Sequence, residues 1–324
     1  MDLEKATRGA EIVTEKWLNL DSRDVLLIVT DDSHADEAQL LKQFARKKGC
    51  RTDIMITRQS GKMVGIYFDE TPDAFDDYTI IIGATDYSLV TTRAAKNAIR
   101  QGKKFLSLPL HTNDGRSMLE YDFLLCDTEQ SKMLAQKLTD ILHTAKEIHV
   151  TTPIGSDMYF YKKDRHCKFF NGNVDDCDRY SSASIEVYVP IEETKTHGVL
   201  FPDGSYGYAG KIECPFRVIF ENGRITEIED SPFGNILKEF IDDYNDEKMY
   251  IASEFGIGLN SLSRCKGNCY IEDESSLGTF HIGFGRNLAL GGNMEASGHF
   301  DLTMFSPDIY ADNIKIMEKG KIII

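Results

Sequence analysis

The chain has 324 residues, with 52 acidic and 37 basic side chains and a formal net charge of −15 at pH 7. Hydrophobic residues make up 41% of the chain and charged residues 27%, which is typical of a globular protein rather than a disordered one. The acidic balance argues against a nucleic-acid-binding protein, because binding to the phosphate backbone needs a basic face, and it disfavours anionic membrane surfaces.

No run of residues approaches the ~20 apolar positions of a membrane-spanning helix, and the N-terminal segment is charged throughout. We therefore expect neither a membrane span nor a signal peptide. The cysteines are scattered, and only Cys265 and Cys269 lie close together, with no second pair for a zinc ribbon. These features predict a soluble cytoplasmic protein with reduced thiols.

The first half of the chain alternates between buried strands and amphipathic helices. Apolar residues recur at helical spacing near the N-terminus, and the apolar run at 24–30 is typical of a strand buried on both faces of a parallel sheet. Further helices are predicted at 35–48, 91–101 and 129–146, and further strands at 52–57, 78–83, 104–108 and 148–152. This alternation predicts a doubly wound parallel α/β domain, flavodoxin-like or Rossmann-like, over residues 1–150.

The segment after the first strand argues against a bound nucleotide. Residues 30–34 include no glycine to bring the backbone near phosphates, and two acids there would repel them. Neither a G-x-G-x-x-G motif nor a P-loop occurs in the chain, so we expect no NAD or ATP. His111 follows the strand at 104–108, where open α/β sheets place functional residues. It is either an ordinary surface histidine or an acid–base residue that serves the other domain.

The second half of the chain, residues 151–324, predicts a glycine-rich and mainly antiparallel β domain. Two short apolar runs at 214–220 and 224–229 flank Asn222-Gly223, a pair that favours a hairpin turn. One helix is predicted at 233–245, and a last hairpin at 314–324 turns at Lys319-Gly320. We expect a curled sheet or a partial barrel with one packing helix.

Two segments of this domain share an unusual pattern. In residues 254–258 and 281–285 alike, a residue of a type that binds metals comes first. It is followed in order by an apolar residue, a glycine, another apolar residue and another glycine. On a strand, alternate residues share a face, so Glu254 and His281 would each stand beside two glycines. Glycine inside a strand is costly unless something approaches closely, such as a ligand.

Two more segments add ligand types to this domain. His299 and Asp301 project from one strand face as a compact two-ligand unit, and Glu186 shares a face with Tyr188. The predicted metal ligands are therefore Glu186, Glu254, His281, His299 and Asp301. They would suffice for two divalent ions, or for one ion with further polar neighbours. The alternative is that each is an isolated polar residue on a solvated strand.

With these segments the chain resembles the thermophilic aminopeptidases (aminopeptidase T, or leucyl aminopeptidase-like metallopeptidases), in a shorter form. The resemblance covers nearly the whole chain, and the matching segments are 151–157, 185–190, 252–260, 273–274 with 281–285, and 299–301. It implies the same five ligands, a homodimer, and two zinc, manganese or cobalt ions per chain. Two positions depart from the family, since Ile185 replaces a glycine and Leu288 replaces a tyrosine. The missing tyrosine puts peptidase activity in question while leaving the metal site in place.

The resemblance implies a metal-dependent hydrolase that cleaves a peptide or small amide bond with a metal-activated water. A carboxylate outside the ligand set must then act as general base, and Glu213, Asp273 and Glu274 are available. We predict Glu274 and His111 as the catalytic residues.

Two alternatives remain open. The superfamily is also similar to dioxygenases that open dihydroxypyridine rings with a single non-haem iron(II), which needs two histidines and one carboxylate. His281, His299 and Asp301 meet that count, although the two glutamates favour paired hydrolytic metals. The other alternative is a degenerate homologue that binds a metal or a peptide without turnover.

Overall fold

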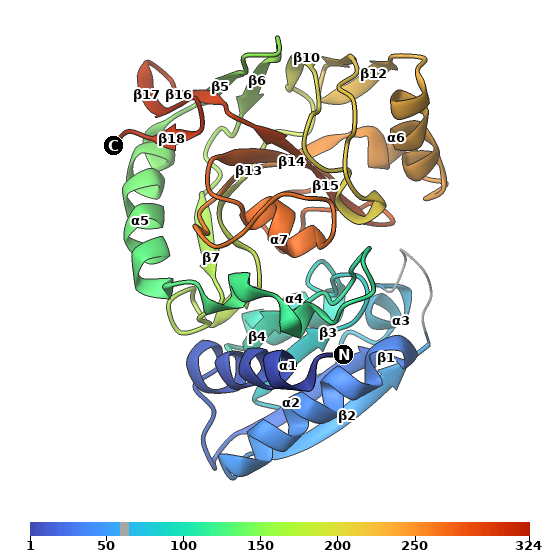
Figure 1. Ribbon diagram of the computed structural model, residues 1–324, viewed down its shortest axis with the longest axis vertical. Coiled ribbons are helices and arrows are strands. Elements are labelled where there is room, and N and C mark those ends of the chain that lie inside the picture. The colour runs from blue at the N-terminus through green and yellow to red at the C-terminus, as the bar shows by residue number, and fades with distance from the viewer. Residues whose placement is uncertain (59–64) are drawn as a thin grey trace. The chain divides into compact units, whose positions relative to one another are not determined.

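The structure is a computed structural model that describes residues 1–58 and 65–324 (Figure 1). The chain divides into two units, one formed by residues 1–128 and 170–184 and the other by residues 129–169 and 185–324. The sequence placed a single division at residue 150. In the structure, the helix and strand predicted at 129–152 belong to the second unit, and the segment 170–184 returns to the first.

A five-stranded parallel sheet forms the core of the first unit, in the order β2-β1-β3-β4-β8. Its strands are β1 (Val25–Asp31), β2 (Arg51–Thr57), β3 (Ile80–Ala84), β4 (Lys104–Ser107) and β8 (Tyr180–Ser182). The apolar run of β1 is buried, as expected for a central strand covered on both faces. The α/β class with a parallel sheet is therefore confirmed for this unit, although its fifth strand is β8 and not the predicted strand near residue 150.

Helices cover this sheet. They are α1 (Leu3–Glu11), a π-helical turn (Ile12–Trp17), α2 (Ala35–Lys47), α3 (Gly65–Glu70) and α4 (Arg93–Arg100). Helix α2 packs on β1 and β2 and contacts α1, whereas α4 packs on β4 and contacts α3. The local signals explain the ends of these helices: Gly49 takes a positive φ just after α2, and the Thr92 hydroxyl accepts a hydrogen bond from the Ala95 amide at the start of α4.

The packing of Trp17 gives a test of this core. The Trp17 side chain is fully buried, and a Cβ at Gly172, which has a φ of +81°, would overlap its indole ring. Gly172→Ala should therefore lower the free energy of unfolding of the first unit by roughly 2–4 kcal/mol, from overpacking and a strained backbone together. Denaturant unfolding followed by Trp17 fluorescence measures this loss, and an unchanged midpoint would contradict the packing described here.

Two antiparallel sheets form the second unit. The eight-stranded sheet has the order β12-β11-β10-β6-β5-β16-β17-β18, and the five-stranded sheet has the order β15-β14-β13-β9-β7. The strands of the larger sheet are β5 (Glu147–Thr151), β6 (Asp157–Tyr161), β10 (His197–Leu200), β11 (Val218–Glu221), β12 (Arg224–Ile228), β16 (Asp308–Ala311), β17 (Ile314–Glu318) and β18 (Lys321–Ile322). The strands of the smaller sheet are β7 (Lys168–Asn171), β9 (Ile185–Pro190), β13 (Ala252–Gly258), β14 (Thr279–Gly285) and β15 (His299–Phe305).

The two sheets pack face to face through aromatic rings. Phe160 of β6 lies against Phe255 of β13, with ring centroids 5.1 Å apart, and Phe220 of β11 lies 6.0 Å from Phe284 of β14. The smaller sheet therefore turns one face toward the larger sheet. Because strand residues alternate between faces, its ligand-type residues lie on the other face.

In the described part of the chain, the α-helices that accompany these sheets are α5 (Thr128–Thr144), α6 (Pro232–Asp242) and α7 (Tyr270–Ser275), where the sequence predicted one helix in its second domain. Helix α7 contacts β9, β13, β14 and β15 (Figure 1). Both predicted hairpins are present, and their turn residues Asn222, Gly223, Lys319 and Gly320 all have positive φ. Among the described residues, no helix has the length and apolar character needed to cross a membrane.

Candidate metal centre

The five predicted ligands come from strands β9, β13, β14 and β15, which are neighbours in the smaller sheet. Partners in an antiparallel pair point to the same face, so the register decides which side chains meet. The register pairs Glu186 with Gly258, Glu254 and Asp301 with Gly283, His281 with Gly256, and His299 with Gly285. Each predicted ligand therefore faces a glycine on the next strand.

These glycines make room for the ligands. A Cβ at Gly256 would overlap Nε2 of His281. A Cβ at Gly283 would lie 2.7 Å from Oδ1 of Asp301 and 2.9 Å from Cε1 of His299. A β-bulge next to Glu254 shifts the register of β13 against β14, as bulges often do beside functional sites. The sequence predicted that something approaches these strand glycines closely. In the structure, the side chains of the predicted metal ligands occupy the space beside them.

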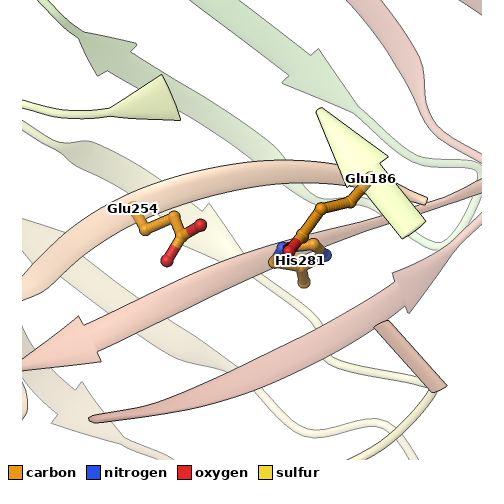
Figure 2. Close-up of side chains that lie close together, drawn as sticks. All are labelled: Glu186, Glu254 and His281. Carbon is orange, nitrogen blue, oxygen red and sulfur yellow. Dashed lines mark ion pairs between the residues drawn. The ribbon is translucent and has the colours of Figure 1, made fainter. Parts of the chain in front are cut away.

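The ligand atoms gather into two overlapping groups. Glu186, Glu254 and His281 form one group, shown in Figure 2, and Glu254, His299 and Asp301 form the other. Within each group the ligand atoms lie within 4.8 Å of one another. Nε2 of His281 is 2.7 Å from Oε2 of Glu186, and Nε2 of His299 is 3.3 Å from Oε2 of Glu254 and 3.4 Å from Oδ2 of Asp301. Glu254 is common to both groups.

Neighbouring groups orient some ligands and leave other atoms without a partner. Nδ1 of His299 donates a hydrogen bond to the Arg286 carbonyl at 2.9 Å, which directs Nε2 toward the carboxylates. The Tyr270 hydroxyl donates to Oδ2 of Asp301. By contrast, Nδ1 of His281 and Oδ1 of Asp301 are buried and make no hydrogen bond to the described residues. Buried polar atoms of this kind are costly unless an ion or another group satisfies them.

Burial and mutual repulsion shift the pKa values of these groups strongly. The pKa of Glu254 is raised to about 7, chiefly by burial and also by repulsion from the Asp301 and Glu186 carboxylates. The His299 imidazole acts in the opposite direction and lowers this pKa. Burial would lower the pKa of His281, but the Glu186 carboxylate and the other acids raise it to about 9. Such a concentration of buried carboxylates with two imidazoles favours a bound cation, which would compensate the negative charge.

Glu274, one of the two predicted catalytic residues, lies on α7 and is buried. Burial, followed by repulsion from Glu186, Asp301 and Glu254, raises its pKa well above the ordinary value. Its Oε2 atom has no hydrogen-bond partner among the described residues. Glu274 is therefore coupled electrostatically to the ligand cluster and is able to hold a proton there.

The other two carboxylates considered as a base are placed differently. Glu213 is exposed and forms an ion pair with Lys211 at 2.9 Å. Asp273 is buried but accepts hydrogen bonds from the backbone amides of Lys266 and Gly267, so it holds a loop. Tyr270 was not predicted as part of the site, although it precedes Glu274 by four residues and so shares a helix face with it. The short polar segment of α7 has no apolar periodicity that would predict a helix.

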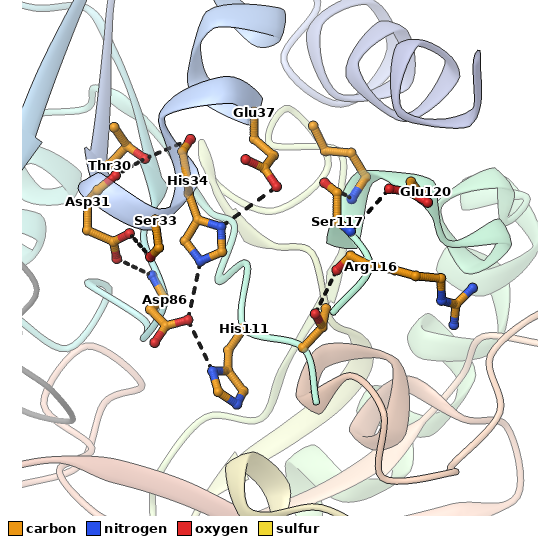
Figure 3. Close-up of polar contacts among 12 residues, drawn as sticks. Thr30, Asp31, Ser33, His34, Glu37, Asp86, His111, Arg116, Ser117 and Glu120 are labelled. Carbon is orange, nitrogen blue, oxygen red and sulfur yellow. Dashed lines mark hydrogen bonds and ion pairs between the residues drawn. The ribbon is translucent and has the colours of Figure 1, made fainter. Parts of the chain in front are cut away.

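His111, the other predicted catalytic residue, belongs to the first unit. It lies in a polar cluster at the carboxyl ends of the parallel strands (Figure 3). Oδ1 of Asp86 is 3.0 Å from Nδ1 of His111 and 3.2 Å from Nε2 of His34, and the Asp86 amide donates to the Asp31 carboxylate. The His111 ring also stacks on Tyr87. His111 is thus held by specific partners, and its catalytic role stays a prediction.

This cluster predicts a pH-dependent stability. Burial opposes the charge of His34, but the hydrogen bond to Asp86 and the Glu37 carboxylate, 3.8 Å from Nδ1, raise its pKa from 6.5 to about 9. The folded state therefore binds more protons than the unfolded state between these values, so this stabilisation is complete below about pH 6.5 and is lost as the pH rises through 9. Urea unfolding of the wild type and of His34→Gln across this range should show the difference between them shrinking with pH. A difference that does not vary with pH would contradict the assignment.

Comparison with known proteins identifies the family. The model of the 2,5-dihydroxypyridine 5,6-dioxygenase (NicX) family matches residues 73–324, which include all five predicted ligands. The chain belongs to this family. A curated relative, the 2,5-dihydroxypyridine 5,6-dioxygenase of Pseudomonas putida, is 24% identical over 214 residues. That match covers 60% of this chain and 59% of the relative, so the chain spans less than two thirds of its length.

Two solved structures share the fold of this family member. The structure of 2,5-dihydroxypyridine dioxygenase from Pseudomonas putida KT2440 matches with a TM-score of 0.81 and 16% identity, over 100% of this chain and 98% of that one. Aminopeptidase AmpT from Thermus thermophilus matches with a TM-score of 0.66 and 14% identity, over 99% of both chains. At these identities the similarity shows the fold alone.

The hydrolase prediction is therefore wrong. The family match and the curated relative both favour the dioxygenase alternative over the zinc-dependent aminopeptidase. The resemblance to aminopeptidase T was correct at the level of the fold. Donor types misled the prediction, because two glutamates beside two histidines were taken as evidence for a second metal ion.

Proposed function

We propose that this family member is an iron(II)-dependent dioxygenase that opens the ring of a dihydroxypyridine-like N-heteroaromatic substrate. The observation that supports this most directly is the convergence of two histidines and several carboxylates in one buried cluster, inside the part of the chain that the family model matches. The name of the curated relative supports the substrate class.

The residues present fit one iron(II) ion. Non-haem iron oxygenases use two histidines and one carboxylate with open positions beside them. His281, His299 and Asp301 supply that set, and Glu254, common to both groups of ligand atoms, lies within reach of all three. The buried atoms without partners at His281 and Asp301 are those that an ion would satisfy. We propose these four residues as the ligands, with Glu186 beside His281 as the carboxylate that orients its imidazole.

Bound iron(II) supplies the redox chemistry that allows an aromatic ring to react with dioxygen. The chain supplies proton handling and orientation. A dihydroxypyridine must lose hydroxyl protons as its ring opens. Once a bound cation offsets the carboxylate repulsion that raises the pKa of Glu274, this residue can take up a proton at its Oε2 atom, which has no partner among the described residues. Tyr270 holds the Asp301 carboxylate through its hydroxyl, and the packing of α7 on all four ligand strands excludes water from one side of the cluster.

Oxygen consumption tests this proposal. The protein purified without oxygen and loaded with iron(II) should consume one O2 per molecule of 2,5-dihydroxypyridine, because both oxygen atoms enter the opened product and no external reductant is needed. The zinc-loaded protein is the matched control and should consume none. Absence of oxygen uptake with this compound and its dihydroxypyridine isomers, in protein shown to contain iron, would refute the proposed function.

A further inference from the structure

A second feature of the second unit lies apart from the ligand cluster. A pocket of about 470 Å³ opens between the end of α5, the loop after β6 and the loop after β9. This volume is in the range of small-molecule sites, roughly 300–1,000 Å³. None of the residues that line the pocket belongs to the metal centre.

The pocket is basic in a protein with a net charge of −15. Its lining includes Lys146, Lys163, Arg165 and Lys195, together with His143 and His166. The imidazoles of His143 and His166 stack in nearly parallel planes, with ring centroids 5.1 Å apart. The acidic residues of the lining are Asp164 and Glu192. Cations therefore outnumber acids here, against the balance of the whole chain.

The ion pairs show which of these cations are available. Lys195 is paired with Glu192 at 3.1 Å, and the Arg165 guanidinium is held by Glu193 at 2.5 Å and by the Ile191 carbonyl. No carboxylate of the described residues lies within ion-pair distance of the exposed Lys146 and Lys163 side chains. The ammonium groups of Lys146 and Lys163 are thus available to bind a ligand, whereas the Arg165 guanidinium is already bound by Glu193 and the Ile191 carbonyl.

A buried lysine behind the lining strengthens the positive field. Lys162 is only 2% exposed, and its ammonium donates hydrogen bonds to the backbone carbonyls of His143 and Arg165, each at 3.0 Å. It thereby ties two walls of the pocket together and neutralises the carbonyl end of α5, which would otherwise repel an anion. No carboxylate forms an ion pair with Lys162 among the described residues, so its charge is compensated only by these carbonyl groups.

We propose that this pocket binds a small, multiply charged anion, a phosphate or a dicarboxylate, held by the ammonium groups of Lys146 and Lys163. Ammonium groups on flexible stems accept either geometry, whereas bidentate recognition by Arg165 is prevented by its existing partners. The volume of about 470 Å³ fits a metabolite rather than a polymer, and the acidic remainder of the chain disfavours a nucleic acid.

Calorimetric titration of the full chain at low ionic strength tests the proposal, with inorganic phosphate and succinate as separate probes. Saturable binding of either probe is expected, and the probe that binds distinguishes the two ligand classes. The double variant Lys146→Gln/Lys163→Gln should weaken binding roughly tenfold, whereas Lys238→Gln, an exposed lysine on α6, should leave it unchanged. Added salt should weaken wild-type binding, because the charges are exposed to solvent.

Two outcomes would overturn this site. One is the absence of saturable binding for both probes, and the other is a double variant that binds as tightly as the wild type. Because both lysines are exposed, the variants are expected to fold, and circular dichroism checks this. Iron content and oxygen uptake should be the same in the double variant and the wild type, so failure of this proposal is separate from failure of the proposed function.

Discussion

Gly256→Ala is expected to weaken metal binding strongly although every ligand remains in the chain. A Cβ at this position would overlap Nε2 of His281, and the residue sits in a fully buried strand where the backbone has little freedom to move. The imidazole must therefore rotate away from the carboxylates. We expect the affinity for iron(II) to fall by roughly 100-fold or more, as judged by competition with a chelator of known affinity.

The matched control is Gly102→Ala. Gly102 has a positive φ, unlike Gly256, and a Cβ there would meet nothing within 4 Å, so this variant carries a backbone strain of its own without disturbing the cluster. It should bind iron like the wild type even if it is slightly less stable. Normal iron binding by Gly256→Ala would mean that His281 is not a ligand.

Glu254→Gln is expected to lower iron affinity much more than Glu186→Gln. Both substitutions preserve the side-chain shape and remove one charge, and both residues are 4% exposed. Glu254 belongs to both groups of ligand atoms, whereas Glu186 belongs to one and lies 2.7 Å from His281. Replacing a direct ligand should lower the iron affinity by roughly 100-fold or more, and replacing a neighbour of a ligand should lower it by about 10-fold.

The same chelator competition compares the two variants, with oxygen uptake as a second readout. Equal losses in both variants would contradict a single ion centred on Glu254 and would favour two equivalent positions. A larger loss of affinity in Glu186→Gln would indicate that the ion is bound in the group formed by Glu186, Glu254 and His281.

Much of the site could be predicted from the sequence because strand alternation is a local property. The two segments with a ligand type followed by spaced glycines, and the pair His299 and Asp301, fixed which side chains share a face. The structure brings all of them together. Local sequence does not report register, so the pairing of each ligand with a glycine on the next strand became visible only in the structure.

The parts that were missed depend on contacts distant in sequence. The strand predicted near residue 150 was identified correctly as a strand, but it pairs with β6 and β16 and not with the parallel sheet, where β8 takes its place. Apolar periodicity does not specify a partner strand. Helix α7 was missed because its six residues are too few to show an apolar periodicity, and the contact from Tyr270 to Asp301 was missed with it.

The choice between hydrolase and oxygenase could not be made from the donor set. The same histidines and carboxylates suit two hydrolytic metals or one iron with charged neighbours. In the structure, Oε2 of Glu186 lies 2.7 Å from Nε2 of His281. This carboxylate can therefore act as a partner of the histidine and need not bind a second ion. Counting ligand types therefore does not decide the number of metals.

Metal content per chain, measured by mass spectrometry on protein purified without oxygen or chelator, tests the central claim most directly. We expect close to one iron per chain, lost when Asp301 is replaced by alanine and retained in Gly102→Ala. Two zinc, manganese or cobalt ions per chain, or no metal even after reconstitution with iron(II), would contradict the single-iron centre.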